Sequence, residues 1–556
     1  MSKRKSRQTD ENIITVDNLD STKTHISKHE LFSYVLGTGF YSMFIGMITN
    51  YKSDYINNII KLNETNQQIL NVIVALVGFA VGFGIMTFID NFHGKRGKFR
   101  PIALISAIPM GLFGFLMFYT PFSNANTLLA MFYLVAVNVI YNGLVTLTAT
   151  ANSVAIVMTP NERERNSLLS TNGFFSSIMS SAPLVIILIF GFFQYKYDKD
   201  GNVTSGYYSK NTMYIIALAL CAVLYVAFMA NAMLKVKERV PYNNKKSSPL
   251  DGLSHVVKNK NFWFLTLANA IREVRLLGMG FGIFVAGALL GDTSKYILIG
   301  LPTGIGTVIS MLIVKKLIKK MDPIKVYTIF GVYSLLANTL AFFIAYIYFK
   351  QGGIGWQIAF IASLFLIGLQ FGSSNLLPNI FNADVLNEIE LQSGGKRLEG
   401  TVTFSATIVT TIMTVITGIF TPTILLKVCK YQQGTDIQSQ STKIKLVFFY
   451  TIFVGLCFVL SLLPMLGYRL TTKKRDAINK QLETLRAQRL QNLTENDEDA
   501  TSQTPDAMPD IQVATPEISD NSIEKGGDIT TQAMNDAYAQ EYAEKEEDSS
   551  PPKEEQ

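Results

Sequence analysis

Twelve apolar runs, separated by polar loops, constrain the fold of this 556-residue chain more than any other feature. A helix needs about 20 mostly apolar residues to cross the hydrocarbon core of a bilayer, so each run is long enough to span a membrane. The composition agrees, because 48% of the residues are hydrophobic and only 16% are charged. The sequence therefore predicts an all-α membrane protein with twelve transmembrane helices. The runs cover residues 31–51, 69–89, 102–120, 127–157, 168–194, 212–234, 262–290, 294–314, 326–348, 354–379, 401–426 and 446–468.

The twelve runs fall into two groups of six, and a long polar loop with Pro241 and Pro249 separates the groups. Two parallel halves of six spans around a midplane cavity are the arrangement of the major facilitator fold, in which one half rocks against the other. The sequence predicts the following parts: a cytosolic N-terminus (1–30), a first six-helix half (31–234), a central cytoplasmic loop (235–260), a second six-helix half (261–470), a cytosolic amphipathic helix (471–494) and an acidic tail (495–556).

Both chain ends are expected in the cytosol. The first thirty residues lack the apolar segment of a signal peptide. The five loops on the side of the N-terminus contain 20 Lys and Arg residues, and the six loops on the other side contain 11. Because positive residues accumulate on the cytoplasmic side, this bias orients the bundle in the plasma membrane. It also explains the basic charge of the body without nucleic-acid binding.

The segment after the last run consists of a basic part with helical spacing and an acidic tail. Ile478, Leu482 and Leu485 recur at helical spacing between basic residues, which is typical of a helix lying at the inner membrane surface or of a solvated charged helix. Residues 495–556 contain 18 Asp and Glu but only 3 Lys, with few large apolar residues. Such a tail is expected to be disordered. It is the part of the chain expected to bind a protein partner.

A charged stretch interrupts the seventh run. Asn269, Arg272, Glu273 and Arg275 cover roughly 160° of one helix face, and ionised groups at mid-membrane depth are expensive unless they face a wet cavity or a partner. We therefore expect them to line the interior of the bundle. One alternative is that the helix begins only at Leu276 and the charges lie among cytosolic headgroups, although the fifteen residues that remain are too few to span. Another is a purely structural Arg-Glu pair.

Three loop motifs resemble those of one transporter family. Residues 90–101 (DNFHGKRGKFRP) are similar to the D-x-x-x-x-x-x-G-K-x-R-P loop of the glycoside-pentoside-hexuronide cation symporters, the family of melibiose permease. Residues 161–165 (NERER) resemble its P-x-E-R-x-R turn, and residues 378–400 resemble its A-D-x-x-x…T-G-x-R-x-E-G segment. The resemblance covers about residues 31–470. It implies transport of a sugar, glycoside or uronide.

The same loops are expected to form a cytoplasmic gate. Asp90 is placed to accept from Arg96 or Arg100, and acidic residues after the tenth run are placed to pair with arginines of either half when the cytoplasmic side closes. The alternative is an ordinary solvated inner face. The expected gate residues are Asp90, Lys98, Arg100, Arg163, Arg165, Asp384, Arg397 and Glu399.

The chain departs from the family at its binding positions. Aspartates on the second and fourth spans hold the coupling cation in the family, but the matching positions here are Gly78, Gly82 and Thr148. A hard cation needs a site rich in carboxylate oxygen, so the sodium cage is expected to be absent. The family's sugar-holding Asp and Arg, and a lysine of the eleventh span, correspond to Thr38, Gly173 and Thr411.

The remaining polar residues of the spans are the predicted solute site. Two guanidiniums beside one carboxylate favour a solute with an anionic group, and Glu273 is the candidate for proton coupling. Asn172, near the inner end of the fifth run, is a further polar residue of the spans. The predicted substrate-binding residues are Asn269, Arg272, Glu273, Arg275, Thr38, Thr148, Asn152, Gly173, Gln370, Asn375 and Thr411.

The residues leave three functions open: a secondary transporter of a small polar solute, a transporter of a lipid-linked or other anionic amphiphile, and a sensor or scaffold that binds without cycling. An enzyme is not expected, because the four histidines all lie in cytosolic segments without a nucleophile, base or metal spacing beside them. No cofactor or metal site is expected. The expected partners are the solute and membrane lipids.

Overall fold

The computed structural model describes residues 24–485, except 93, 95–96, 123, 160, 198–202, 240–252, 395–397, 436 and 483. Within these residues, twelve helical segments are long and apolar enough to cross a membrane, which confirms the twelve predicted spans. The elements are α1 (Lys28–Asp54), η2 (Tyr55–Ile59), α2 (Glu64–Asn91), α3 (Phe99–Leu116), α4 (Leu128–Thr148), α5 (Thr150–Val157), α6 (Glu162–Gly191), β1 (Lys196–Tyr197), β2 (Val203–Ser205), α7 (Lys210–Lys235), α8 (Leu253–Lys258), α9 (Lys260–Glu273), α10 (Arg275–Met279), α11 (Gly282–Leu290), η3 (Thr293–Tyr296), α12 (Ile297–Leu317), α13 (Pro323–Gln351), α14 (Ile354–Gln392), α15 (Glu399–Pro422), η4 (Thr423–Val428), α16 (Gln440–Phe448), η5 (Phe449–Phe453), α17 (Val454–Leu460) and α18 (Leu462–Met465).

Side-chain caps set where many of the spans begin. Ser27 accepts from the Glu30 backbone N–H at the start of α1, and Asn63, Thr127 and Ser209 cap α2, α4 and α7 in the same way. Each cap satisfies one backbone donor that the first turn of a helix leaves free. The polar residues that end one loop therefore also start the next span.

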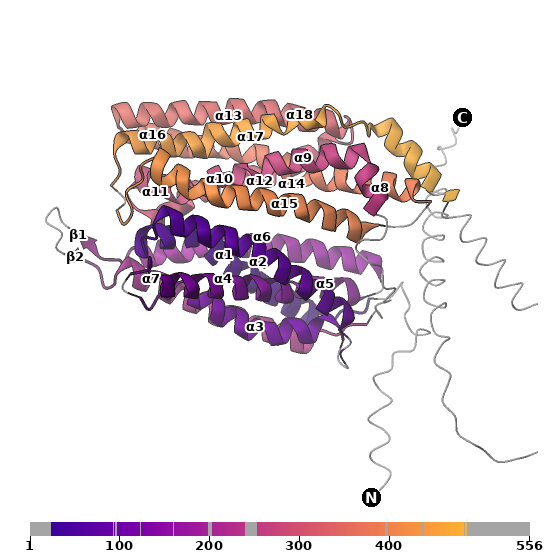
Figure 1. Ribbon diagram of the computed structural model, residues 1–556, viewed down its shortest axis with the longest axis horizontal. Coiled ribbons are helices and arrows are strands. Elements are labelled where there is room, and N and C mark those ends of the chain that lie inside the picture. Colours follow the sequence, from indigo (N-terminus) through magenta and orange to yellow (C-terminus); the bar gives the residue numbers. More distant parts are fainter. Residues whose placement is uncertain are drawn as a thin grey trace, which may run out of the picture.

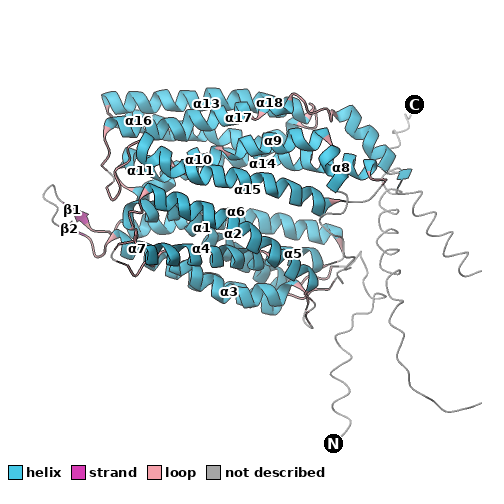
Figure 2. Ribbon diagram, in the orientation of Figure 1, coloured by secondary structure: helices cyan, strands magenta, loops and turns pink. Residues whose placement is uncertain are grey.

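The spans run side by side in two halves (Figure 1, Figure 2). Helices α1 to α7 form one half and α8 to α18 form the other, and all spans lie roughly parallel. The antiparallel β1-β2 hairpin projects from one end of the bundle, which we call the hairpin end, and α5 and α8 lie at the opposite end, which we call the α8 end.

The seventh span starts earlier than its charged stretch. It begins at Lys260 and runs through α9, α10 and α11 to Leu290, with short interruptions at Val274 and between α10 and α11. Arg272 is therefore about 18 Å along the helix from Lys260. The alternative in which this helix begins only at Leu276 is wrong.

Glycines set the closest helix contacts in the second half. A Cβ added to Gly306 on α12 would overlap the carbonyl oxygen of Phe365 on α14, and a Cβ on Gly368 of α14 would overlap the carbonyl oxygen of Thr303. Small residues at such contacts let helix backbones approach closely, which is how packing stabilises helix pairs in a membrane.

The two halves meet at the hairpin end. Several polar contacts join the halves there, and the rings of Phe83 on α2 and Phe404 on α15 also meet farther toward the α8 end, with 5.6 Å between their centroids. On one side, Gln68 of α2 donates to Thr423 Oγ1 (2.8 Å) and Asn71 donates to the carbonyl of Gly418 on α15 (3.0 Å).

On the other side of the interface, α6 meets α12 and diverges from it toward the α8 end. A Cβ on Gly300 would lie 3.1 Å from Leu184 Cδ1. Gly173 is three turns from Leu184 on nearly the same face of α6, and a Cβ there would meet nothing within 4 Å. Gly304, one turn beyond Gly300, is equally open. On this side the halves thus form a vertex that closes at the hairpin end.

A C-terminal helix (residues 472–482) packs under the second half at the α8 end. Ile478 and Leu482 are buried in the same hydrophobic cluster as Val385 and Ile389 of α14. Two of the three residues of the predicted apolar stripe therefore contact protein.

Candidate functional site

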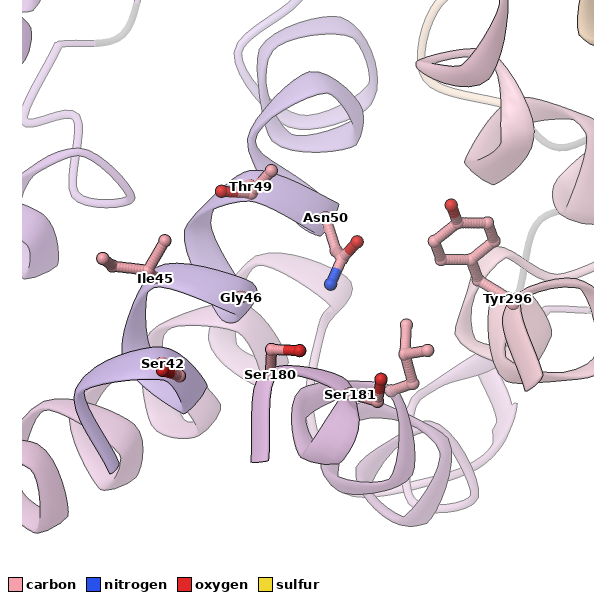
Figure 3. Close-up of a pocket in the computed structure, with 10 residues that line it drawn as sticks. Ser42, Ile45, Gly46, Thr49, Asn50, Ser180, Ser181 and Tyr296 are labelled. Carbon is pink, nitrogen blue, oxygen red and sulfur yellow. The ribbon is translucent and has the colours of Figure 1, made fainter. Parts of the chain in front are cut away.

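A cavity of about 470 Å³ lies at the vertex between the halves (Figure 3). Helices α1 and α6 of the first half form two of its walls, and η3 with the start of α12 forms the third. Its lining residues are Ser42, Ile45, Gly46, Thr49, Asn50, Ser180, Ser181, Leu184, Tyr296 and Gly300.

The cavity lining is polar and uncharged. Five of the ten lining side chains carry a hydroxyl group and one carries an amide. Among the described residues, the side chains of Thr49, Asn50, Ser181 and Tyr296 make no hydrogen bond to protein, so their polar groups are available to a solute. Asn50 and Tyr296 point into the same open space from opposite halves (Figure 3). Hydroxyl and amide groups both donate and accept, which suits a ligand that itself carries hydroxyl groups.

Close packing of α1 against α6 positions this lining. A Cβ on Gly46 would overlap the carbonyl oxygen of Ser180, so only glycine lets the two helices meet here. Tyr296 is placed by the short η3 helix, and its ring meets that of Tyr51 edge to face with 6.5 Å between centroids. The aromatic contact between the halves therefore borders the cavity.

The charged stretch of the seventh span turns its arginines toward α14. Arg272 donates to the Ser374 carbonyl (3.1 Å) and Arg275 donates to Ser374 Oγ (2.8 Å). The Arg275 guanidinium also lies 5.1 Å from the centre of the Phe371 ring. Both side chains are buried, and Arg272 also pairs with Glu273 (3.2 Å). The two arginines thus lie inside the second half.

The other members of that stretch are less enclosed. Asn269 and Glu273 are partly buried, and the Glu273 side chain is 33% exposed. None of the residues 269–275 lines the cavity at the vertex.

Gln370 belongs to a separate buried network within the second half. Its Oε1 accepts from Ser334 Oγ and from Asn338 Nδ2 (2.9 Å), both on α13. Its role there is a hydrogen bond between α13 and α14.

Two further predicted residues are buried in the first half. Thr38 is fully buried one turn before Ser42 and donates to Asn172 Oδ1 on α6. Thr148 is buried and shares a hydrogen bond with Ser106 of α3 (2.8 Å).

The remaining predicted site residues lie on four different helices. Asn152 and Asn375 are exposed on α5 and α14, Gly173 is open on α6, and Thr411 is partly buried on α15. Their part in solute binding stays a prediction.

Two of the predicted gate residues contact partners within their own half. Asp384 pairs with Arg475 of the C-terminal helix (3.6 Å), so it does not pair with an arginine of the first half in this conformation. Arg100 donates to the Met233 and Leu234 carbonyls at the end of α7 (3.1 and 3.3 Å).

Other gate residues are only partly described. Lys98 is buried over the Phe99 ring, Arg163 is exposed and Arg165 is partly buried. Arg397 and the side chains of Asp90 and Glu399 lie outside the described residues.

The sequence did not single out the cavity residues or Glu238. Ser42, Thr49, Ser180 and Ser181 are small neutral residues on otherwise apolar helices, where they are common without any function. Asn50 is the one cavity residue that the sequence could have indicated, because it is an amide near the end of an otherwise apolar run. Glu238 accepts from the backbone N–H groups of Lys98, Phe99 and Arg100 and so caps α3 from the central loop. Nothing in the sequence connects these two segments.

Twelve spans in two halves that meet around a polar cavity define a membrane transporter of the major facilitator fold. Within that class, the chain belongs to the MFS/sugar transport protein family, whose sequence model matches residues 33–472. This match confirms the resemblance to the glycoside-pentoside-hexuronide symporters.

Known relatives agree with this assignment. The chain is 25% identical to an isoprimeverose transporter of Lactiplantibacillus pentosus over 266 residues, which are 46% of this chain and 51% of the relative. The alignment thus spans about half the length of that relative. Among solved structures, the nucleoside transporter NupG has a TM-score of 0.53 at 14% identity, over 80% of this chain and 100% of NupG. A bacterial homologue of the human lysosomal transporter Spinster has a TM-score of 0.50 at 12% identity, over 80% of this chain and 98% of that one. At these identities the structural likeness concerns the fold alone.

Proposed function

We propose that this protein is a secondary transporter that moves a neutral sugar or glycoside across the plasma membrane by alternating access. The observation that carries the proposal is the uncharged, hydroxyl-rich cavity at the vertex of the two halves. An anionic uronide or lipid headgroup would need a positive partner there, and the two buried arginines of the seventh span donate to Ser374 instead. The sugar named for the isoprimeverose transporter is consistent with this class of solute.

The orientation in the membrane follows from charge. The loops at the α8 end carry the excess of Lys and Arg, so we place this end, with both chain termini, in the cytosol. The vertex then closes toward the outside, which makes this an inward-facing conformation. A solute in the cavity would be released between α6 and α12, whose facing surfaces at Gly173 and Gly304 are open.

Removal of the cavity's polar groups is expected to weaken solute binding. In proteoliposomes, Asn50→Ala should raise the KM for the transported sugar about tenfold, because one or two hydrogen bonds are lost. Tyr296→Phe should have a smaller effect, since only the hydroxyl is removed. The measurement is uptake of a panel of labelled neutral sugars, glycosides, uronides and lysolipids.

The matched control for this panel is Val223→Ala, at an exposed apolar position of α7. Arg272→Ala belongs in the same panel, because the part of residues 269–275 in solute binding is still a prediction. Saturable uptake of a uronide or lysolipid, with neutral sugars excluded, would contradict the proposed solute class.

Uptake is expected to be independent of sodium. Residues 65–89 of the second span and 128–157 of the fourth contain no Asp or Glu, so neither span offers the carboxylates that a sodium site uses. Replacing sodium by choline at constant ionic strength should change the initial uptake rate by less than about twofold. Uptake driven by an imposed sodium gradient would show that another set of ligands holds the ion.

A further inference from the structure

The hairpin end is held closed by a group of contacts that we call the latch. It joins Asn57, Asn58 and Leu62 of the first half to Tyr431, Gln433 and Gly434 in the loop after η4 of the second. Gln433 Nε2 donates to the Leu62 carbonyl (2.9 Å) and to Asn57 Oδ1 (3.2 Å). These bonds form one arm of the latch.

Asn58 forms the other arm, and it uses both ends of its amide. Its Oδ1 accepts from Tyr431 Oη (3.1 Å) and from the Gly434 backbone N–H (3.0 Å), both across the interface. Its Nδ2 donates to Asp54 Oδ1 (2.6 Å), one helical turn back in the first half. If the Asn58 amide were rotated by 180°, its oxygen would face the Asp54 carboxylate. Its NH₂ group would then face the Tyr431 hydroxyl and the Gly434 N–H, which donate to Asn58 in the present orientation. The carboxylate of Asp54 therefore decides which face Asn58 presents to the second half.

Asp54 itself is held entirely by the first half. Its side chain is fully buried, and its Oδ2 accepts from Tyr214 Oη and pairs with Lys210 Nζ (3.1 Å), both on α7. Hydrogen bonds to an ionised group are stronger than those between neutral groups, so this carboxylate is a firm anchor. Asp54 makes no hydrogen bond to the second half among the described residues.

The backbone conformation at Gly434 favours glycine. Its φ of +80° lies in the left-handed region, and a Cβ there would overlap the end of the Lys61 side chain. The backbone N–H that Asn58 accepts thus comes from a turn shaped for close contact.

We propose that Asp54 is a positioning residue for the gate at the hairpin end: by orienting the Asn58 amide, it sets the stability of the inward-facing state. The proposal rests on the alternating access of the proposed function, because the latch must open when the halves rock. It does not depend on which solute is carried. The Asp54 carboxylate is itself fixed by its contacts with Lys210, Tyr214 and Asn58.

The test measures the separation of the halves at the hairpin end without solute. Spin labels at Leu129→Cys and Ile354→Cys, both exposed at the starts of α4 and α14, report that distance, and the three native cysteines are buried. In the full-length protein, Asp54→Asn is expected to raise the ratio of open to closed hairpin end about tenfold, since Asn58 loses its fixed orientation.

A swapped pair distinguishes positioning from a general loss of structure. In the double variant Asp54→Asn with Asn58→Asp, the amide at 54 donates to the carboxylate at 58, which still accepts from Tyr431 and Gly434. The distance distribution should return to within about twofold of the wild type. Asp292→Asn is the matched control, because Asp292 caps η3 at the same end and asparagine caps equally well.

An unchanged distribution in Asp54→Asn, or a swapped pair that behaves like Asp54→Asn, would overturn the proposal. Should Asp54→Asn fail to fold, Tyr431→Phe removes one latch bond from the other side and must still shift the distribution toward the open state. If the spin-label distances change as expected in Asp54→Asn and the swapped pair but no sugar is taken up, the result would count against the proposed solute and not against the latch.

Discussion

Replacement of Ser181 by phenylalanine is expected to lower sugar uptake about 100-fold, which corresponds to ~2.7 kcal/mol of binding free energy. Ser181 lines the cavity from α6 and is exposed, so a large ring at this position fills space that the solute needs and displaces few protein atoms. Thermal stability of the purified protein should therefore change little. The measurement pairs initial uptake rates in proteoliposomes with unfolding curves in detergent.

The control for this substitution is Val223→Phe, which adds a ring at an apolar position of α7 that is 67% exposed. It should transport like the wild type. Uptake by Ser181→Phe within about threefold of the wild type would mean that the solute passes elsewhere, and would remove the cavity as the binding site.

Replacement of Gly368 by valine is expected to destabilise the second half by about 3 kcal/mol. A Cβ at this position overlaps the carbonyl oxygen of Thr303, which is backbone and cannot move aside without separating α12 from α14. In a membrane, where apolar lipid replaces water, such packing is a main source of helix association. The expected result is a lower unfolding temperature and a lower yield of monodisperse protein.

Gly304→Val supplies the matched control, because Gly304 lies on α12 next to the same contact and a Cβ there meets nothing within 4 Å. Equal stability of the two variants would show that the helices do not pack through Gly368 in the membrane.

The spans themselves could be predicted from the sequence, because a helix that crosses a bilayer must satisfy its backbone internally and be apolar along its whole length. These requirements leave a signal that needs no partner, and the twelve runs correspond to the twelve spans. The three loop motifs likewise pointed to the right family. The position of Arg272 inside the seventh span could be predicted from helix length alone. The fifteen residues from Leu276 to Leu290 are too few to cross the membrane, so the helix had to include the residues before Leu276.

The surroundings of the charged residues could not be predicted in the same way. Helical spacing placed Arg272 and Arg275 on one face, but it did not indicate that this face meets Ser374 and Phe371 of α14. Asp384 is a similar case, because its partner in this conformation is Arg475, a residue of the C-terminal helix. A carboxylate has several arginines within reach in sequence terms, and the packing of the helices selects one.

The sequence by itself determined the membrane class, the number of spans and the family, because hydrophobic length and loop motifs are local properties of the chain. Only the tertiary structure decided where a solute could bind and which end of the bundle is closed. Both depend on how residues far apart in the sequence meet: Asn50 with Ser181 and Tyr296 at the cavity, and Asn58 with Tyr431 at the latch. A neutral polar side chain on an apolar helix becomes part of a site only through the neighbours that packing brings to it.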